Sequence, residues 1–196
     1  MSKAILILIT APSGAGKSTL CDRLLSEFEN ITYSVSCTTR MPRGEEEDGV
    51  DYFFVTEESF ERNVAEDRFL EHAEVHGNMY GTLKDTVREA IMEGSSVLMD
   101  IDVQGARQIR EELADLPDDD PLKAGYVDIF ISPPSIDTLR ERLYGRGEDN
   151  EEEIERRLNN AALEMAGKDE FRFVILNDDL DVAYKELREI VEMVTL

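Results

Sequence analysis

The stretch Ala11-Pro-Ser-Gly-Ala-Gly-Lys-Ser18 decides the fold of this chain. It follows an apolar run at residues 4–9 and precedes a helical pattern at residues 19–28. A strand, a glycine-rich turn and a helix start in this order predict a phosphate-binding loop. Ala11 takes the place of the first glycine in the usual pattern, and alanine is the mildest replacement if its φ is negative. A chance glycine-rich turn is the alternative, and Gly-Lys-Ser-Thr at the helix start argues against it.

The residue types of this loop suit an anion. Gly14 and Gly16 let backbone N–H groups close around a phosphate, and the helix N-terminus adds further unpaired N–H groups. Lys17 would bring a positive charge to the outer phosphates, and Ser18 would bring a hydroxyl group for Mg²⁺. We therefore expect nucleotide phosphates to bind at the end of the first strand.

Composition restricts the classes of partner. The chain has 196 residues, of which 41% are hydrophobic, and this suits one globular domain with lobes. A count of 21 Lys and Arg against 44 Asp and Glu gives a net charge of −23, which argues against nucleic acid or an anionic membrane as a partner. A phosphate site must therefore be a local basic patch in an acidic field. The candidates for this patch are Lys17, Arg40, Arg43, Arg142, Arg146 and Arg157.

Cysteines and the start of the chain indicate the compartment. Cys21 and Cys37 have no metal-ligand spacing and cannot form a disulfide framework, so a reducing cytoplasm is the expected setting. Residues 1–12 hold one lysine and a short apolar run that leads straight into the glycine-rich loop, which argues against a signal peptide. No segment has the apolar length that spans a membrane. The spacing of His72 and His76 indicates neither a metal site nor a catalytic base, so we expect structural or solvated histidines.

Apolar, β-rich runs alternate with helical patterns, which predicts an α/β fold with a mainly parallel sheet and helices on both faces. Strands are expected at residues 5–10, 32–37, 52–55, 96–101, 127–131 and 173–176. Helices are expected at residues 19–28, 57–66, 82–93, 136–144, 150–168 and 180–194. Nearly continuous apolar runs, at 5–9, 97–99, 127–131 and 174–176, fit central strands that are covered on both faces.

Two segments differ from this alternation. Residues 33–80 hold shorter strands, turns at Gly44 and Gly49, and polar residues interleaved with Tyr and Phe, so we interpret them as a smaller inserted lobe. Residues 115–125, with two prolines and four aspartates, are expected to form a solvated loop.

Two further motifs place charged residues beside a strand. The run Val97-Leu-Met-Asp-Ile-Asp102 is an apolar strand that ends in acids, and such an aspartate downstream of a phosphate loop can hold Mg²⁺. In Ser36-Cys-Thr-Thr-Arg-Met-Pro-Arg43, two arginines three residues apart can grip one phosphate, and the hydroxyl group of Tyr52 could join them. Taken alone, the first motif would be interpreted as an acid that begins a turn, and the second as a surface segment with ion pairs. The phosphate loop upstream favours the functional interpretation.

The order of these motifs makes the chain resemble the guanylate kinase family, whose members transfer a phosphoryl group from ATP to GMP. The resemblance runs from about residue 5 to about residue 194. The joint order of its blocks is highly specific, although each block alone is much less so. The blocks are APSGAGKST, SVSCTTRMPRGEEEDGVDYFFV, FLEHAEVHGNMYGT, VLMDIDVQGA, PPSIDTLRERLYGRGEDNEEEIERRL and NDDLDVAYKEL.

The resemblance implies roles for individual residues. The ATP site would consist of Pro12, Ser13, Gly14, Ala15, Gly16, Lys17, Ser18, Thr19, Arg142, Asn177 and Asp178. The GMP site would consist of Ser36, Arg40, Arg43, Tyr52, Glu71, Tyr80, Thr82 and Asp102. In that site Arg40, Arg43, Tyr52 and Tyr80 would grip the phosphate, and Glu71 and Asp102 would recognise the base, helped by Ser36 and Thr82. The catalytic residues would be Lys17, Arg43, Arg146 and Arg157, and Ser18 and Asp100 would lie at Mg²⁺.

The resemblance also implies a division of the single domain, residues 1–196, into three parts. The core would comprise 1–32, 83–138 and 169–196, the GMP-binding lobe about 33–82, and a mobile lid about 139–168. Arg146 and Arg157 lie on this charge-rich segment, which carries Gly145 and Gly147. A lid that closes over ATP would insert these arginines and exclude water. A helix with surface ion pairs is the alternative for this segment.

The chemistry of guanine supports the assignment of Glu71 independently. Guanine presents two adjacent donors, N1–H and the N2 amino group, and one carboxylate accepts from both. Adenine presents an acceptor at N1 and lacks the 2-amino group, so a buried carboxylate would be left unpaired. Without the family resemblance, we would interpret Glu71 as an exposed charged residue.

Three other functions remain open at this point. A kinase of the same class could act on AMP, UMP or dTMP, although Glu71 with Asp102 favours guanine. A guanylate-kinase-like binding module would be expected to lack the lysine and arginines that this chain keeps. A small NTPase switch would not need a second phosphate site with paired arginines. Oligomeric state stays open between a monomer and a homo-oligomer, and the expected base contacts do not demand a 2′-hydroxyl, so dGMP is a further expected substrate.

Overall fold

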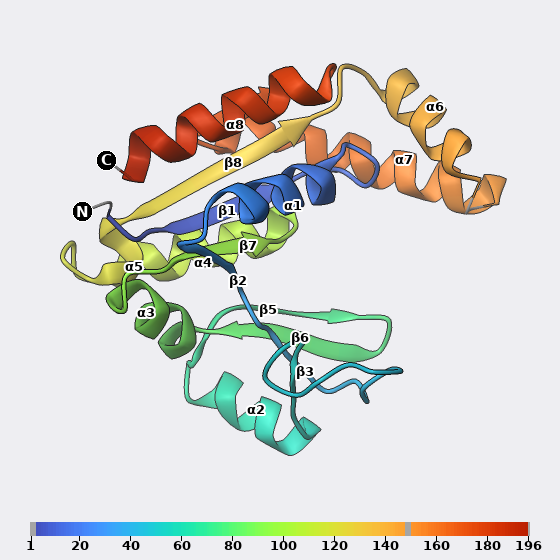
Figure 1. Ribbon diagram of the computed structural model, residues 1–196. Helices are drawn as coiled ribbons and strands as arrows, with labels where there is room; N and C mark the ends of the chain where they lie inside the picture. Colours follow the sequence, from blue (N-terminus) through green and yellow to red (C-terminus); the bar gives the residue numbers. More distant parts are fainter. Residues whose placement is uncertain (1–2, 148–149, 196) are drawn as a thin grey trace.

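The computed structural model describes residues 3–147 and 150–195, and a parallel five-stranded sheet forms its centre (Figure 1). The strand order is β2-β7-β1-β8-β9, and every pair in this sheet is parallel. The carboxyl ends of β1 and its two neighbours therefore meet at one edge, where Ile9 pairs with Asp100. The bounds are β1 Leu6–Thr10, β2 Ile31–Tyr33, β7 Ser96–Asp100, β8 Tyr126–Ser132 and β9 Phe173–Leu176. The expected α/β fold is confirmed.

Helices cover both faces of this sheet (Figure 1). The side chains of β1 alternate between the two layers: Ile7 and Ile9 pack in one apolar cluster, while Leu6 and Leu8 pack in the other. This explains why β1 reads as a continuous apolar run. The first layer holds α1 (Lys17–Glu27) and α8 (Leu180–Thr195), and the second holds α3 (Lys84–Met92), α4 (Val103–Asp115) and α5 (Pro121–Ala124). None of the described helices is long and apolar enough to cross a membrane.

A second sheet lies below the body in Figure 1, with strand order β4-β3-β6-β5. The helix α2 (Glu57–Ala65) packs against it through Phe60, whose ring stacks on that of Phe69 with centroids 4.5 Å apart. Its strands are β3 (Cys37–Thr38), β4 (Phe53–Phe54), β5 (Phe69–Val75) and β6 (Asn78–Leu83).

A helical pair projects from the other end of the body (Figure 1). It consists of α6 (Ile136–Arg146) and α7 (Glu151–Ala166), which share an apolar cluster of their own. The short helix η1 (Lys168–Glu170) then leads back to β9.

The structure corrects four expectations. The single strand expected at 32–37 is two strands in different sheets, because the chain passes from the body to the small lobe between β2 and β3. The helix expected at 82–93 begins at Lys84, and Thr82 belongs to β6, which pairs with β5 across a turn where His76 and Gly77 have φ of 52° and 76°. Residues 174–176 are not doubly covered, since β9 is an edge strand in which the side chain of Leu176 is 54% exposed.

The segment 115–125 is the fourth correction, because it is not only a solvated loop. It contains α5, which begins at Pro121 and is capped by the Asp120 carboxylate, the acceptor of the Leu122 N–H at 3.0 Å. Leu122 is fully buried in the layer below the sheet.

We expect Leu122→Ala to lower the free energy of unfolding by about 2–5 kcal/mol, because it leaves a cavity in the core. The matched control is Leu163→Ala, whose side chain is 76% exposed and whose loss should cost less than about 0.5 kcal/mol. Urea unfolding followed by circular dichroism measures both variants. Equal midpoints for the two would mean that α5 adds nothing to the core.

Candidate active site

The phosphate loop connects β1 to α1. Gly14 and Gly16 have φ of +88° and +92°, a region that glycine adopts at little cost. A Cβ atom on Gly16 would lie 2.3 Å from Nδ2 of Asn177, and this amide donates a hydrogen bond of 2.7 Å to the Ala15 carbonyl oxygen. Asn177 is buried at the end of β9, so the loop rests on a side chain from the far edge of the sheet.

The charged groups of this loop face the end of β7. The Lys17 ammonium group forms an ion pair with the Asp100 carboxylate, and both side chains are about one-fifth exposed. Ser18 and Thr19, in the first turn of α1, are exposed. The N-terminus of α1 therefore presents its unpaired N–H groups, a cation and hydroxyl groups at one place.

The helical pair of residues 136–166 contacts the phosphate loop from the side. Nη1 of Arg157 donates to Oγ of Ser13 at 3.3 Å, and Nε of Arg157 donates to Glu153 at 3.2 Å. Arg156 and Arg157 hold the pKa of Glu153 at about 2. Nη2 of Arg142 donates to the Asn177 carbonyl oxygen at 2.9 Å. Arg146 ends α6, and its side chain lies outside the described part of the chain.

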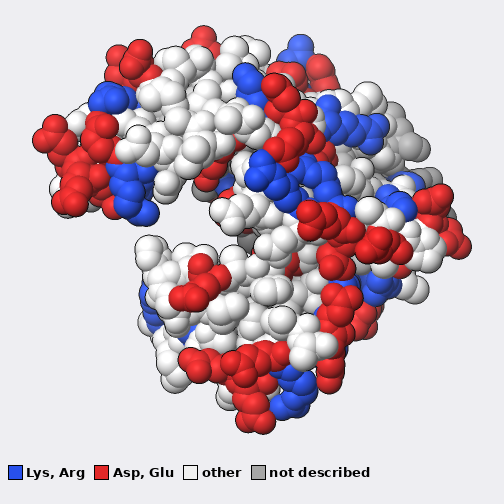
Figure 2. Space-filling model, turned by 180° about the vertical axis from the view of Figure 1, so that it is seen from behind, with Lys and Arg blue, Asp and Glu red and all other residues white. Residues whose placement is uncertain are grey.

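A cavity of about 320 Å³ lies between the body and the small lobe. Figure 2 shows the corresponding notch, with the small lobe on one side and the rest of the molecule on the other. Seven residues expected at the GMP and Mg²⁺ sites line the cavity: Ser36, Tyr52, Glu71, Tyr80, Thr82, Asp100 and Asp102. Tyr33 and Asp51 also line it and were not expected from the sequence.

A hydrogen-bonded chain of side chains forms one wall of this cavity. Oγ1 of the buried Thr82 donates to Oε1 of Glu71 at 2.9 Å and lies 3.2 Å from Oγ of Ser36. Asp102 caps α4 and accepts the Gly105 N–H at 2.7 Å. The Glu71 carboxylate reaches the same turn, since a Cβ on Gly105 would lie 3.7 Å from its Oε2. Two carboxylates from different lobes are thus neighbours.

These surroundings change the acidity of Glu71. Burial raises the pKa of Glu71 above its ordinary value of 4.5, and the neighbouring Asp102 carboxylate raises it further, while the Thr82 hydrogen bonds act in the opposite direction. Burial has the largest effect, so the net direction is upward.

The expected phosphate grip is only partly assembled in the structure. Arg40 is buried, and its two terminal nitrogens donate to Glu46 at 3.0 Å and 2.9 Å. Its guanidinium carbon lies 5.3 Å from the centre of the Tyr52 ring. The Glu46 carboxylate and the Tyr80 hydroxyl raise the pKa of Arg40, so this cation stays charged. Neither Arg40 nor Arg43 lines the cavity; Arg43 is exposed, and its backbone N–H donates to Glu46 at 2.7 Å.

Glu46 contacts both arginines of the expected phosphate grip, a position that the sequence did not reveal. It is one of three consecutive glutamates after Gly44, and nothing in the pattern separates it from its neighbours. Its single carboxylate orients the Arg40 guanidinium and the turn that carries Arg43.

The raised pKa of Glu71 predicts that GMP affinity falls on acidification at a higher pH than an ordinary glutamate would allow. The expected guanine contact needs the ionised carboxylate, whose second oxygen stays an acceptor while Thr82 donates to the first, so affinity is full above the pKa and is lost as the pH falls through it. Calorimetric titration of GMP between pH 4.5 and 8 measures this effect. Because the GMP phosphate also titrates, near pH 6, Glu71→Gln is the control. A profile identical in the two proteins would contradict the prediction.

A phosphate loop beside a pocket, with a buried arginine on the lobe that forms one side of the pocket and a helical pair in contact with the loop, defines the class of P-loop kinases that phosphorylate a nucleotide. The guanylate kinase family model matches residues 3–194. The chain belongs to the guanylate kinase family, and its reaction is the transfer of the terminal phosphoryl group of ATP to GMP.

Individual relatives agree with this assignment. A guanylate kinase of Nitratidesulfovibrio vulgaris is 51% identical over 184 residues, which cover 94% of this chain and 84% of that protein. One of Symbiobacterium thermophilum is 44% identical over 189 residues, which cover 96% and 85%. The crystal structure of guanylate kinase from Anaplasma phagocytophilum superposes with a TM-score of 0.70 at 32% identity and covers 100% of this chain and 88% of that one.

Proposed function

We propose that Glu71 and Asp102 select guanine as the base of the acceptor. The observation that carries this proposal is that both carboxylates line one cavity and meet at the first turn of α4. Thr82 donates to one oxygen of Glu71, which leaves its other oxygen, and Asp102, to accept from guanine N1–H and the 2-amino group. Ser36 and Thr82 support this wall.

Arg40, Arg43, Tyr52 and Tyr80 would bind the GMP phosphate. Arg40 is buried and already oriented by Glu46, so it loses little side-chain freedom when a phosphate arrives. The exposed Arg43 would have to turn toward the cavity. The ribose 2′-hydroxyl has no part in these contacts, so dGMP is proposed as a second acceptor.

On the donor side, residues 12–19 would hold the ATP phosphates, with Lys17 at the outer ones. Arg142, Asn177 and Asp178 would contact the rest of ATP. Ser18 and Asp100 fit Mg²⁺, because both supply oxygen donors: Asp100 ends β7 beside β1, and it pairs with Lys17, the residue before Ser18 in the first turn of α1. When bound with ATP, Mg²⁺ would neutralise charge on the phosphates. Lys17, now paired with Asp100, would then turn to the phosphates.

Residues 139–168 would act as a lid over ATP, residues 33–82 as the acceptor lobe, and the remainder as the core. Phosphoryl transfer needs in-line positioning and charge stabilisation rather than an acid or a base. Arg157, which already contacts Ser13, and Arg146 would supply positive charge to the moving phosphoryl group. The two buried cysteines are compatible with a cytoplasmic setting, and a monomer or a homo-oligomer fits equally.

An acceptor comparison tests the base assignment. ADP production from ATP and Mg²⁺ is measured with GMP, dGMP, AMP, UMP and dTMP offered separately. We expect turnover with GMP and dGMP to exceed the others by about 10⁴-fold or more, because AMP lacks the N1–H and 2-amino donors for the carboxylate oxygens that Thr82 and Gly105 leave open. Equal turnover of AMP and GMP would contradict the base-recognition roles.

For the lid, we expect Arg157→Ala to lower kcat by about 10²-fold or more, with the KM for GMP little changed. Arg140→Ala is the matched control, since Arg140 also lies on the helical pair and its ion pair with Glu155 stays within that pair. If Arg157→Ala turned over as fast as Arg140→Ala, the lid assignment would be wrong.

A further inference from the structure

The outer edge of β5 is occupied by a glutamine side chain rather than by another strand. Oε1 of Gln108 accepts the His72 N–H at 3.0 Å, and Nε2 of Gln108 donates to the His72 carbonyl oxygen at 3.2 Å. A side-chain amide carries the same donor and acceptor as a peptide group, so Gln108 completes the edge as a strand would. The residue it holds, His72, follows Glu71 directly.

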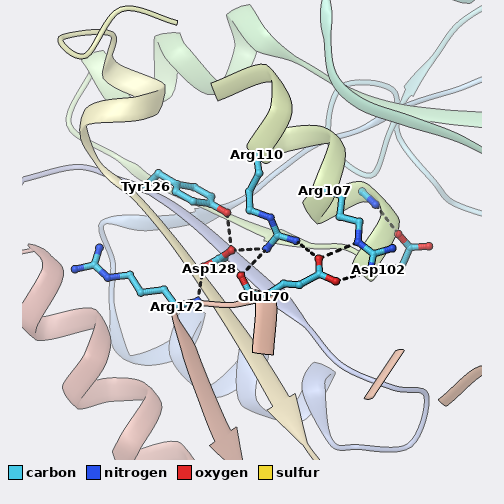
Figure 3. Close-up of polar contacts among 8 residues, drawn as sticks. Asp102, Arg107, Arg110, Tyr126, Asp128, Glu170 and Arg172 are labelled. Atoms are coloured by element: carbon cyan, nitrogen blue, oxygen red, sulfur yellow. Dashed lines mark hydrogen bonds and ion pairs between the residues drawn. The ribbon is translucent and has the colours of Figure 1, made fainter. Parts of the chain in front are cut away.

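Gln108 lies on α4, and α4 is fixed to the body. Figure 3 shows Arg107 and Arg110 reaching Glu170 and Asp128 from this helix. Nε of Arg107 donates to Glu170 at 2.8 Å, and Nη1 of Arg110 donates to Asp128 at 2.8 Å. Asp128 is buried on β8 and also accepts from the Tyr126 hydroxyl at 2.8 Å. These charge-assisted bonds make α4 a firm support.

The same helix begins at Asp102, whose carboxylate caps it. One carboxylate of the base-recognition pair therefore belongs to α4, and the other belongs to the strand that α4 grips through Gln108. Two carboxylates side by side repel each other. Leu70, the neighbour of Glu71 on β5, packs in the apolar cluster that also holds Ile109 of α4, and the Gln108 bonds add directional contacts that fix the backbone beside Glu71 against this repulsion.

We propose that Gln108 is a positioning residue for guanine recognition, which holds Glu71 at the distance from Asp102 that the pairing edge of guanine requires. This inference rests on the proposed roles of Glu71 and Asp102. Gln108 does not line the cavity of about 320 Å³ and acts through the backbone of His72.

Two variants test the proposal. Gln108→Ala removes both hydrogen bonds, and the isosteric Gln108→Glu keeps the acceptor for the His72 N–H but places an oxygen against the His72 carbonyl. The matched control is Glu111→Ala, an exposed residue one turn further along α4. Steady-state kinetics are measured with GMP and with IMP, which lacks the 2-amino group, together with the KM for ATP, thermal midpoints and the exchange rate of the His72 amide.

We expect both variants to raise the KM for GMP about tenfold, while the KM for ATP and the kcat at saturating GMP stay within about twofold. The preference for GMP over IMP should fall at least fivefold, and the His72 amide should exchange faster. Glu111→Ala should match the original protein in all of these.

Two results would overturn the proposal. If the KM for GMP and the preference for GMP over IMP are unchanged in both variants, the two Gln108 hydrogen bonds only satisfy the backbone groups at the edge of β5. An equal loss for ATP and GMP with a lower thermal midpoint would show a general structural role. Glu71→Gln, measured alongside, separates the role of Glu71 from that of Gln108. If it impairs GMP use while the Gln108 variants do not, the assignment of Glu71 to guanine recognition stands and only the positioning role of Gln108 is wrong.

Discussion

Lys17→Ala is expected to lower kcat by about 10³-fold, or about 4 kcal/mol of transition-state stabilisation. Lys17 is the cation that begins α1, at the point where the phosphate loop and the end of β7 meet. Negative charge on the phosphate oxygens must be stabilised during transfer, and neighbouring N–H groups carry only partial charges. The loss should therefore appear in kcat more than in the KM for GMP.

Stability is the necessary control for this variant, because Lys17→Ala also removes the partner of Asp100. The Asp100 side chain is 21% exposed, so water can solvate the remaining carboxylate and the fold should persist. Lys185→Ala, an exposed lysine on α8, should leave kcat unchanged. If kcat falls by less than tenfold in a folded Lys17→Ala protein, Lys17 is not a catalytic residue.

Glu71→Gln is expected to lower kcat/KM for GMP by about 10²-fold or more, with the KM for ATP unchanged. The glutamine presents an NH₂ group to guanine donors where the carboxylate presented an acceptor, so a favourable contact becomes a repulsive one. The cavity also loses one negative charge beside Asp102, which relieves repulsion and should keep the protein at least as stable.

Glu74→Gln is the matched control for this change, since Glu74 lies on the same strand with an exposed side chain. Steady-state kinetics with GMP, IMP and AMP measure both variants. The preference for GMP over AMP should collapse in Glu71→Gln only. Equal preference in the two variants would mean that Asp102 or the backbone recognises the base.

The centre of the fold could be predicted because local pattern and tertiary position agree there. A continuous apolar run predicts a doubly covered strand, and β1 is one. Parallel pairing then places the ends of β1 and β7 side by side, so the phosphate loop and Asp100 meet as expected. Position within the sheet is a non-local property, which is why the apolar β9 was wrongly expected to be central.

The acceptor side was harder to predict. The hairpin of β5 and β6 carries polar and half-exposed residues, so it lacks the apolar alternation that marks a strand. The helix α4 was missed although Val103, Ala106, Ile109 and Leu113 repeat at helical spacing, a signal that was available in the sequence. The roles of Glu46 and Gln108 depend on contacts between segments and leave no local pattern.

The bond between Asn177 and Ala15 also bears on how the protein is made. The first strand, the glycine-rich turn and the start of α1 leave the ribosome early, yet the side chain on which the turn rests lies 162 residues further on. A nascent chain that ends before β9 has the phosphate loop but not its support. The phosphate loop should therefore acquire its final shape only when synthesis is nearly complete.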